Sequence, residues 1–279
     1  MKTAVGHSQI VPAIPTIREA QKFLAKHFGT TRLIAAPFLS QRTGKSVYLK
    51  LETELPTGSF KVRGAVYALA QRMNRGPIQE VVACSTGNHG AAVAFAAKQF
   101  GIKARIFLPT NCNLVKRERI STLGASIVES GESDLTDEDL PAGPATIGCE
   151  ILEQLPETNA IVVPMGDTAL IRGIAAAAKQ IAPQLKIIGV QAERAPSYYL
   201  SWKEGKVVGT ETCDTIADGL ATRTPAEANV REVKNLVDEV VLVSEEQLLR
   251  AIETLLLEEH VLAEPAGAAS AAALLQGEA

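Results

Sequence analysis

The chain has 279 residues, 46% hydrophobic and 4% aromatic, with a formal net charge of −3. This length supports one large domain or two modest ones with an ample core. No basic tract is present, which argues against nucleic acid as a partner. The apolar runs are too short or too interrupted to span a bilayer, and the N-terminus lacks a signal-peptide core. We therefore expect a cytoplasmic protein that binds no membrane.

The spacing of the four cysteines does not indicate a disulfide framework or a metal-binding motif. Cys84, Cys112, Cys149 and Cys213 are far apart and include no CxxC pair. This spacing favours reduced thiols, which agrees with a cytoplasmic location, and it predicts neither a disulfide framework nor a zinc site. The histidines are equally scattered, so we expect no histidine-based metal centre.

Helix-like and strand-like runs alternate along the chain. The first 36 or so residues carry a helical pattern, clearest at 17–28, with Gly29 as a stop. Strands are then predicted at residues 47–51, 81–84, 104–108, 126–128, 160–164, 186–191 and 240–243. Helices are predicted at residues 62–73, 91–100, 114–123, 145–155, 169–181, 226–236 and 266–275, and from a capping box at 244–247 to residue 258. Such alternation is typical of an α/β protein with parallel sheets flanked by helices.

Three strand-to-helix loops could carry chemistry, because ligands of open α/β sheets bind at the carboxyl ends of strands. The first loop, residues 57–64, places Lys61 after Phe60 at the start of a helix. A lysine amine held there can form a Schiff base with a carbonyl cofactor. The alternative is an ordinary surface lysine at a helix start.

The other two loops favour anions. In residues 85–90, Gly87 lets the backbone approach a ligand carboxylate, and Asn88 can donate to an aromatic hydroxyl, unless it only caps the helix. In residues 164–169, the N–H groups at the helix start could bind a phosphate. The alternative there is an ordinary turn capped by Asp167 or Thr168.

Together, and in this order, the loops resemble the β-family of pyridoxal-phosphate enzymes (fold type II, tryptophan synthase β-like), and within it the threonine/serine dehydratase and serine racemase group. The resemblance covers nearly the whole chain. It is carried by residues 49–52, 57–64, 85–90, 146–148, 150–152, 161–166, 215–219 and 264–268.

The resemblance implies roles for individual residues. Lys61 would form the Schiff base with pyridoxal 5'-phosphate and remove the substrate α-proton, Phe60 would flank the cofactor, and Asn88 would hydrogen-bond its ring hydroxyl. Gly219 would lie beside the ring. The phosphate would be held by Gly166, Asp167, Thr168, Ala169 and Leu170. The substrate carboxylate pocket would be lined by Ser85, Thr86, Gly87 and His89.

The implied reaction is loss of the β-hydroxyl from a hydroxy amino acid, which gives a 2-keto acid and ammonia. Serine or threonine is the expected substrate, with an aryl-serine or hydroxyaspartate as alternatives. An amino-acid racemase, with Thr86 and Lys61 as its two bases, is the enzymatic alternative. A non-catalytic binding protein on the same fold is the alternative from another class.

The resemblance also implies a two-domain fold with the cofactor in the cleft, and a homodimer. A small mobile domain, residues 80–136, would be inserted into a large pyridoxal-phosphate-binding domain made of residues 1–79 and 137–279. Closure of the small domain over substrate would exclude water.

Four features depart from the family pattern. The phosphate loop is usually a run of glycines, whereas here it is Gly-Asp-Thr-Ala at residues 166–169. Gln191 and Ser197 stand where the family places the acids of a divalent-cation site, so we expect that site to be empty. Only an acidic loop lies where the family has a further helix and strand, at residues 130–145, and the chain stops at Ala279, before the family's last strand.

Overall fold

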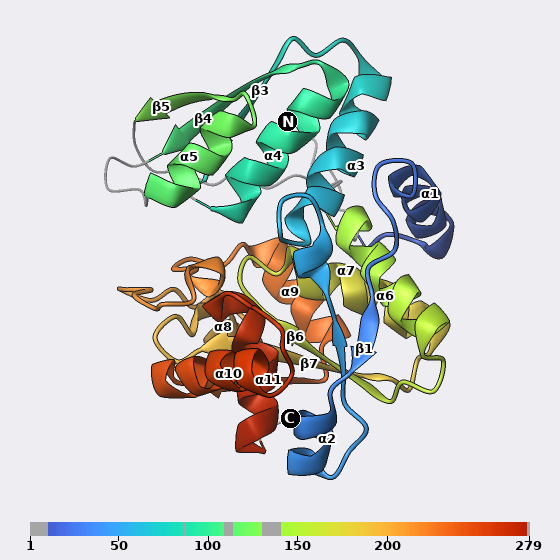
Figure 1. The fold of residues 1–279 in the computed structure, drawn as a ribbon, viewed down its shortest axis with the longest axis vertical. Coiled ribbons are helices and arrows are strands. Elements are labelled where there is room, and N and C mark those ends of the chain that lie inside the picture. Colours follow the sequence, from blue (N-terminus) through green and yellow to red (C-terminus); the bar gives the residue numbers. More distant parts are fainter. Residues whose placement is uncertain (1–10, 86, 109–113, 130–140, 278–279) are drawn as a thin grey trace, which may run out of the picture.

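A computed structural model describes residues 11–85, 87–108, 114–129 and 141–277. Within these ranges the strands form three sheets (Figure 1). Two are three-stranded and parallel, and the third is a two-stranded antiparallel pair of β1 (Leu33–Ala35) and β2 (Tyr48–Lys50). The chain enters through α1 (Ile14–Leu24), and α2 (Pro37–Thr43) connects β1 to β2.

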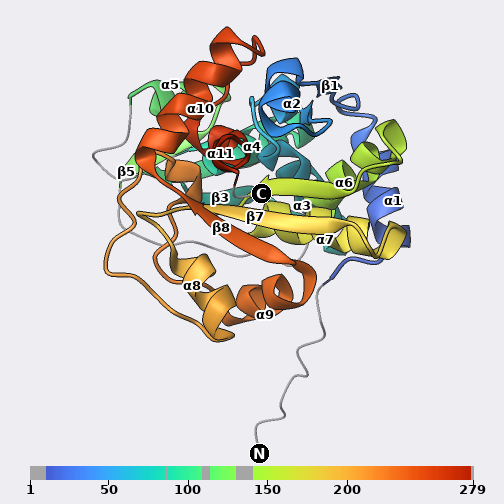
Figure 2. The ribbon, with the colours of Figure 1, turned by 90° about the horizontal axis from the view of Figure 1, so that it is seen from below.

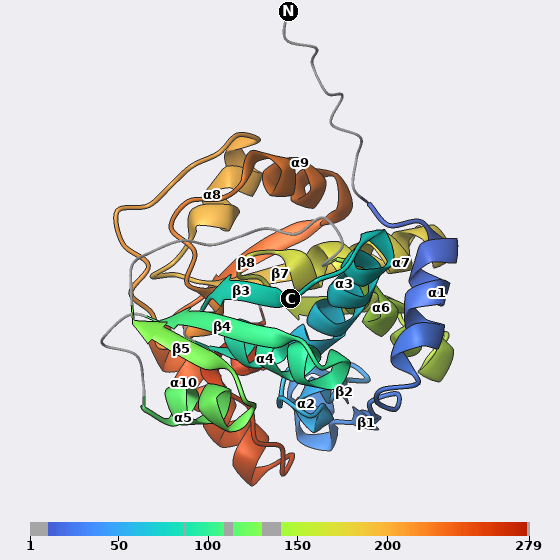
Figure 3. The ribbon, with the colours of Figure 1, turned by 90° about the horizontal axis from the view of Figure 1, so that it is seen from above.

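The upper sheet has the order β3-β4-β5 and consists of β3 (Glu80–Cys84), β4 (Lys103–Leu108) and β5 (Ser126–Glu129). Seen from above, α4 (Asn88–Phe100) and α5 (Leu114–Thr122) lie on one side of this sheet (Figure 3). Both connect parallel strands, as a crossover requires. Small side chains of α4, such as Ala91 and Ala94, pack with Ile106 of β4. Helix α3 (Lys61–Arg75) packs against α4 and precedes the sheet in the chain.

The lower sheet has the order β6-β7-β8 and consists of β6 (Ala160–Pro164), β7 (Lys186–Ala192) and β8 (Glu239–Val243). Figure 2 shows α10 (Glu245–Leu257), α11 (Pro265–Gln276) and α2 on one side of it. The other side carries α7 (Ala169–Ile181), α8 (Ser197–Glu204) and α9 (Glu227–Leu236), and α6 (Ala142–Gln154) packs against α7. Coverage on both faces explains why β7 is buried along nearly its whole length.

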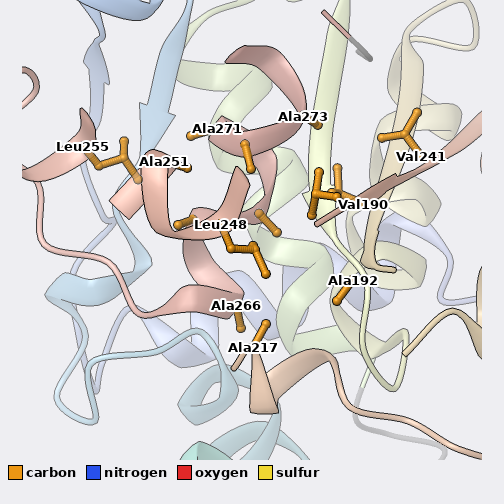
Figure 4. Packing of buried hydrophobic residues seen from close by; sticks show 14 of the residues in the cluster. Val190, Ala192, Ala217, Val241, Leu248, Ala251, Leu255, Ala266, Ala271 and Ala273 are labelled. Atoms are coloured by element: carbon orange, nitrogen blue, oxygen red, sulfur yellow. The ribbon is translucent and has the colours of Figure 1, made fainter. Parts of the chain in front are cut away.

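Side chains alternate between the two faces of each strand, so the lower sheet has one hydrophobic core on each face. Ile187 packs with the α7 side, whereas the next residue, Ile188, packs with the α10 and α11 side. Figure 4 shows the second of these cores, where Val190 and Val241 meet alanines of α11 and Leu248 of α10. Alanine dominates α11 because small side chains let the helix approach the sheet closely.

The structure confirms the α/β class and the parallel sheets, and β6 and α7 have the predicted bounds. The helical pattern at the N-terminus was wrong at its end, because Leu33–Ala35 is a strand that pairs antiparallel with β2. Helices α2 and α8 were not predicted. The two parallel sheets suit a division at residue 80, but the domain boundaries remain a prediction. The acidic loop lies mainly outside the described residues. In the ranges given above, no helix is long and apolar enough to cross a bilayer.

Candidate active site

Lys61 is the first residue of α3 and follows a tight turn. Gly58 has φ of 63°, a backbone conformation that side chains disfavour, and its N–H donates to the carbonyl of Leu55. The Lys61 Nζ atom lies 5.2 Å from the centroid of the Phe60 ring. Both residues line a cavity of about 1170 Å³, so the amine is presented to a space large enough for a small ligand.

Asn88 reaches the same cavity from the upper sheet. Gly87 is the N-cap of α4 and Asn88 is the first helical residue, so the interpretation of Asn88 as the N-cap was wrong. The Nδ2 atom of Asn88 donates to Glu264 Oε1 at 2.7 Å. Glu264 is the N-cap of α11. This hydrogen bond therefore joins α4, which packs on the upper sheet, to α11, which packs on the lower sheet, across the cavity.

The third loop follows β6 and is fitted closely against its neighbours. A Cβ atom at Gly166 would lie 2.2 Å from the carbonyl oxygen of Gly219. A Cβ atom at Gly219 would in turn lie 2.9 Å from the Cβ atom of Ala266. Only glycine allows this approach, which brings the start of α7 beside residue 219.

Thr168, the N-cap of α7, has φ of 74° and is 1% exposed. Left-handed backbone in a non-glycine residue costs about 1–2 kcal/mol, so the surrounding contacts must hold it. Its hydroxyl accepts from Arg172 Nε at 3.1 Å, and the same guanidinium pairs with the buried Glu232 at 2.9 Å. Asn229 donates to the carbonyl of Asp167 and fixes the loop from the other side.

Asp167 is exposed, and its Oδ1 atom accepts from the N–H of Ala169 at 3.2 Å. The structure therefore agrees with the alternative of a capped turn, with Asp167 rather than Thr168 as the capping side chain. This hydrogen bond occupies one of the helix-start N–H groups that were expected to bind a phosphate.

The structure brings most of the expected cofactor residues together. The described cavity lining includes Phe60, Lys61, Asn88, Gly166, Asp167, Thr168, Leu170 and Gly219. Of the residues expected around the substrate carboxylate, Ser85, Gly87 and His89 adjoin Asn88 in the chain without lining this cavity in the part that the structure describes. Thr86 lies outside the described residues.

A buried charge cluster lies beside Lys61, and no sequence pattern pointed to it. The Arg63 guanidinium is 1% exposed and pairs with Glu52 at 2.8 Å and with Glu150 at 2.5 Å. Lys50 also pairs with Glu150, at 2.7 Å. Burial of Arg63 opposes its charge, but the two carboxylates raise the pKa of Arg63 above its ordinary value. The cluster therefore fixes the first turn of α3, where Lys61 stands.

The residues at the family's cation position are engaged in other contacts. Gln191 is buried, and its side-chain oxygen accepts from the N–H of Tyr199 at 2.9 Å. Ser197 donates to the carbonyl of Thr222 at 2.5 Å. Glu193, which lies between these two residues in the chain, is exposed. Across the described ranges, no group of three or more His, Cys, Asp or Glu side chains could hold a metal ion.

Comparisons with known proteins agree with this geometry. The family model described as "Pyridoxal-phosphate dependent enzyme" matches residues 24–279. An L-threonine ammonia-lyase of Thermotoga maritima is 38% identical over 280 residues, which cover 93% of this chain and 70% of that protein. A catabolic L-threonine dehydratase of Escherichia coli is 32% identical over 286 residues, covering 95% and 87%.

Solved structures give the same result. Maize serine racemase superposes with a TM-score of 0.91 at 31% identity, covering 95% of this chain and 87% of that one. A threonine deaminase of T.th. has a TM-score of 0.88 at 30% identity, with coverages of 95% and 93%. The expected resemblance is confirmed, and the chain belongs to the pyridoxal-phosphate dependent enzyme family.

Proposed function

We propose that this protein is a pyridoxal-phosphate-dependent ammonia-lyase that acts on a hydroxy amino acid, with threonine or serine as the preferred substrate. The β-hydroxyl leaves as water, and hydrolysis then yields a 2-keto acid and ammonia. The observation that carries this proposal is the convergence of Lys61, Asn88 and the start of α7 on one cavity. The names of the L-threonine ammonia-lyase and dehydratase relatives support the same reaction.

The residues present fit the cofactor. Its aldehyde requires an amine, its ring hydroxyl a hydrogen-bond donor, and its phosphate a set of N–H groups, and the cavity offers one of each. The close approach of Gly166 to Gly219 leaves backbone rather than side chains where the ring would lie. When bound, pyridoxal phosphate supplies an electron sink for the charge that develops at the substrate α-carbon.

The protein residues supply position and proton transfer. Lys61 would anchor the cofactor through its Nζ atom, and its free amine would remove the substrate α-proton. Asn88 donates from Nδ2, and its hydrogen bond to Glu264 holds the amide in that orientation. Phe60, whose ring centroid lies 5.2 Å from the Lys61 Nζ atom, would flank the cofactor.

The substrate carboxylate is assigned to the turn before α4. Ser85, Gly87 and His89 precede or begin this helix, whose first N–H groups favour an anion. Thr86 belongs to the same turn in the sequence. We assign closure of the small domain, residues 80–136, to the step that completes this pocket and excludes water.

The proposal is tested by supplying the purified protein and its Lys61→Ala variant with pyridoxal phosphate and L-threonine or L-serine. Wild type is expected to form 2-oxobutanoate from threonine or pyruvate from serine with equal ammonia, and the variant neither. The lyase would be rejected if the wild-type protein bound the cofactor but released no keto acid from threonine, serine or their aryl and β-carboxyl analogues.

Amino-acid racemisation is the second candidate, because the serine racemase of maize superposes closely. In that case Thr86 and Lys61 would act from opposite faces of the substrate. A chiral assay of recovered serine separates the two reactions, since a lyase consumes serine without forming its enantiomer. Absence of a Schiff-base band even with excess cofactor would instead favour a non-catalytic binding protein on the same fold.

We further infer that the protein works as a homodimer in the cytoplasm. The family resemblance supports the dimer, and the spacing of the cysteines supports the location. Light scattering at micromolar concentration is expected to give twice the chain mass of 29.6 kDa. A single chain mass would overturn the dimer.

A further inference from the structure

The loop between β6 and α7 carries its own negative charge at the proposed phosphate site. Asp167 lines the cavity together with Gly166 and Thr168. Its carboxylate accepts from the N–H of Ala169, the first residue of α7, at 3.2 Å. Among the described residues, no lysine, arginine or histidine side chain pairs with this carboxylate, whose recorded partner is the N–H of Ala169.

The backbone of the loop has little freedom to carry that carboxylate away. Gly166 is packed against the Gly219 carbonyl, where even a Cβ atom would come within 2.2 Å. Asn229 holds the carbonyl of Asp167 itself at 3.2 Å. Thr168 is held by Arg172, so its hydroxyl points to the buried Arg172–Glu232 pair. The backbone on both sides of Asp167 is therefore fixed.

Helix-start N–H groups favour one anion at a time. A carboxylate at this position stabilises the free protein, because it satisfies an N–H group and complements the positive end of α7. A phosphate dianion arriving at the same N–H group must displace the carboxylate and then remain close to a like charge. The two anions compete for the same few atoms.

We propose that Asp167 is an internal competitor for the cofactor phosphate, and that it sets the affinity for pyridoxal phosphate below what this loop could otherwise reach. The inference rests on the proposed function, because it takes the α7 start as the phosphate site. It assigns Asp167 a role opposite to that of a phosphate ligand. The effect depends on the phosphate group, so it must vanish for pyridoxal, which lacks one.

The test uses the cofactor-free protein and follows the visible absorbance that depends on Lys61 during titration with pyridoxal phosphate and, separately, with pyridoxal. Asp167→Asn removes the charge and keeps an oxygen that can accept from Ala169. Asp167→Ser is a second, smaller neutral replacement in case the first does not fold. Glu211→Gln removes an equally exposed charge from a distant part of the sequence and serves as the control.

Asp167→Asn is expected to tighten the binding of pyridoxal phosphate about fivefold, as one lost like-charge contact at a helix start implies. The affinity for pyridoxal is expected to stay unchanged, and Glu211→Gln is expected to match wild type for both compounds. The gain should shrink at high ionic strength, because screening weakens the repulsion between exposed charges.

Unchanged or weaker binding of pyridoxal phosphate by Asp167→Asn would overturn the inference and leave the proposed function intact. Equal tightening for pyridoxal would also overturn it, since the effect would then not involve the phosphate. No visible band with either compound in any variant would reject the proposed function together with the inference. That outcome is distinct, because the first two both require a band.

Discussion

Replacing Arg63 with methionine tests whether the buried charge cluster holds the start of α3. The guanidinium is 1% exposed and pairs with Glu52 and Glu150, whose side chains are 17% and 4% exposed. Methionine fills a similar volume but leaves both carboxylates without this partner. Lys50 still pairs with Glu150 at 2.7 Å, so Glu52 is the carboxylate that loses most of its ion pairing.

The expected cost follows from this geometry. Breaking a buried ion pair by removing one partner costs about 3–5 kcal/mol, because an uncompensated charge stays behind. Native proteins are stable by only about 5–15 kcal/mol, so Arg63→Met should remove roughly a fifth or more of the total. Lys61 lies two residues earlier in the first turn of α3, and its position should loosen with that turn.

Equilibrium unfolding in urea measures the cost, provided that the slope against urea stays the same in both proteins. Arg105→Met is the matched control, since Arg105 pairs with Glu80 at 3.0 Å but both side chains are well exposed, at 46% and 32%. The control should lose at most about 1 kcal/mol. An Arg63→Met variant no less stable than the control would refute the structural role assigned to the cluster.

Three further changes test other parts of the structure. Ser244→Ala removes the capping box of α10 and should cost about 1 kcal/mol in urea unfolding; no loss would contradict the cap. Gly143→Ala places a Cβ atom 2.5 Å from the backbone of Arg63, so α6 and α3 must separate; we expect a loss of about 1–3 kcal/mol, and an unchanged melting temperature would argue against the close contact. Asp238 is 40% exposed, and although partial burial opposes it, Lys179 and the Ile187 N–H lower the pKa of Asp238. The stabilisation by Asp238 is therefore present above the ordinary carboxyl pKa of about 4 and lost as pH falls through the lowered pKa. In urea unfolding, Asp238→Asn should cost about 0.5 kcal/mol at pH 7 and less at pH 3, and an equal cost at both pH values would contradict the lowered pKa.

The sequence predicted those elements whose signals are local. The strand Ala160–Pro164 is apolar and closed by proline, and the helix Ala169–Ile181 has a clear apolar face, so both were found with correct bounds. The capping box at Ser244 was also confirmed. The strand Leu33–Ala35 was missed because it is only three residues long and depends on pairing with Tyr48–Lys50.

The same difference between local and long-range signals applies to the candidate site. The three loops were found because each follows a strand and begins a helix, which is visible in the sequence. The hydrogen bond from Asn88 to Glu264 joins residues 176 positions apart, and the contact of Arg63 with Glu150 spans 87. No local pattern encodes such pairs. The sequence leaves open whether Asp167 caps its own turn, and only the backbone geometry places the carboxylate on the N–H group of Ala169.

The visible absorbance spectrum of the protein with pyridoxal phosphate, beside that of Lys61→Ala, tests the assignment of Lys61 most directly. Lys186→Ala is the matched control, since Lys186 also lines the cavity. Wild type and the control should show a visible band that Lys61→Ala lacks. A band that persists in Lys61→Ala, or one lost only in Lys186→Ala, would contradict Lys61 as the anchor of the cofactor.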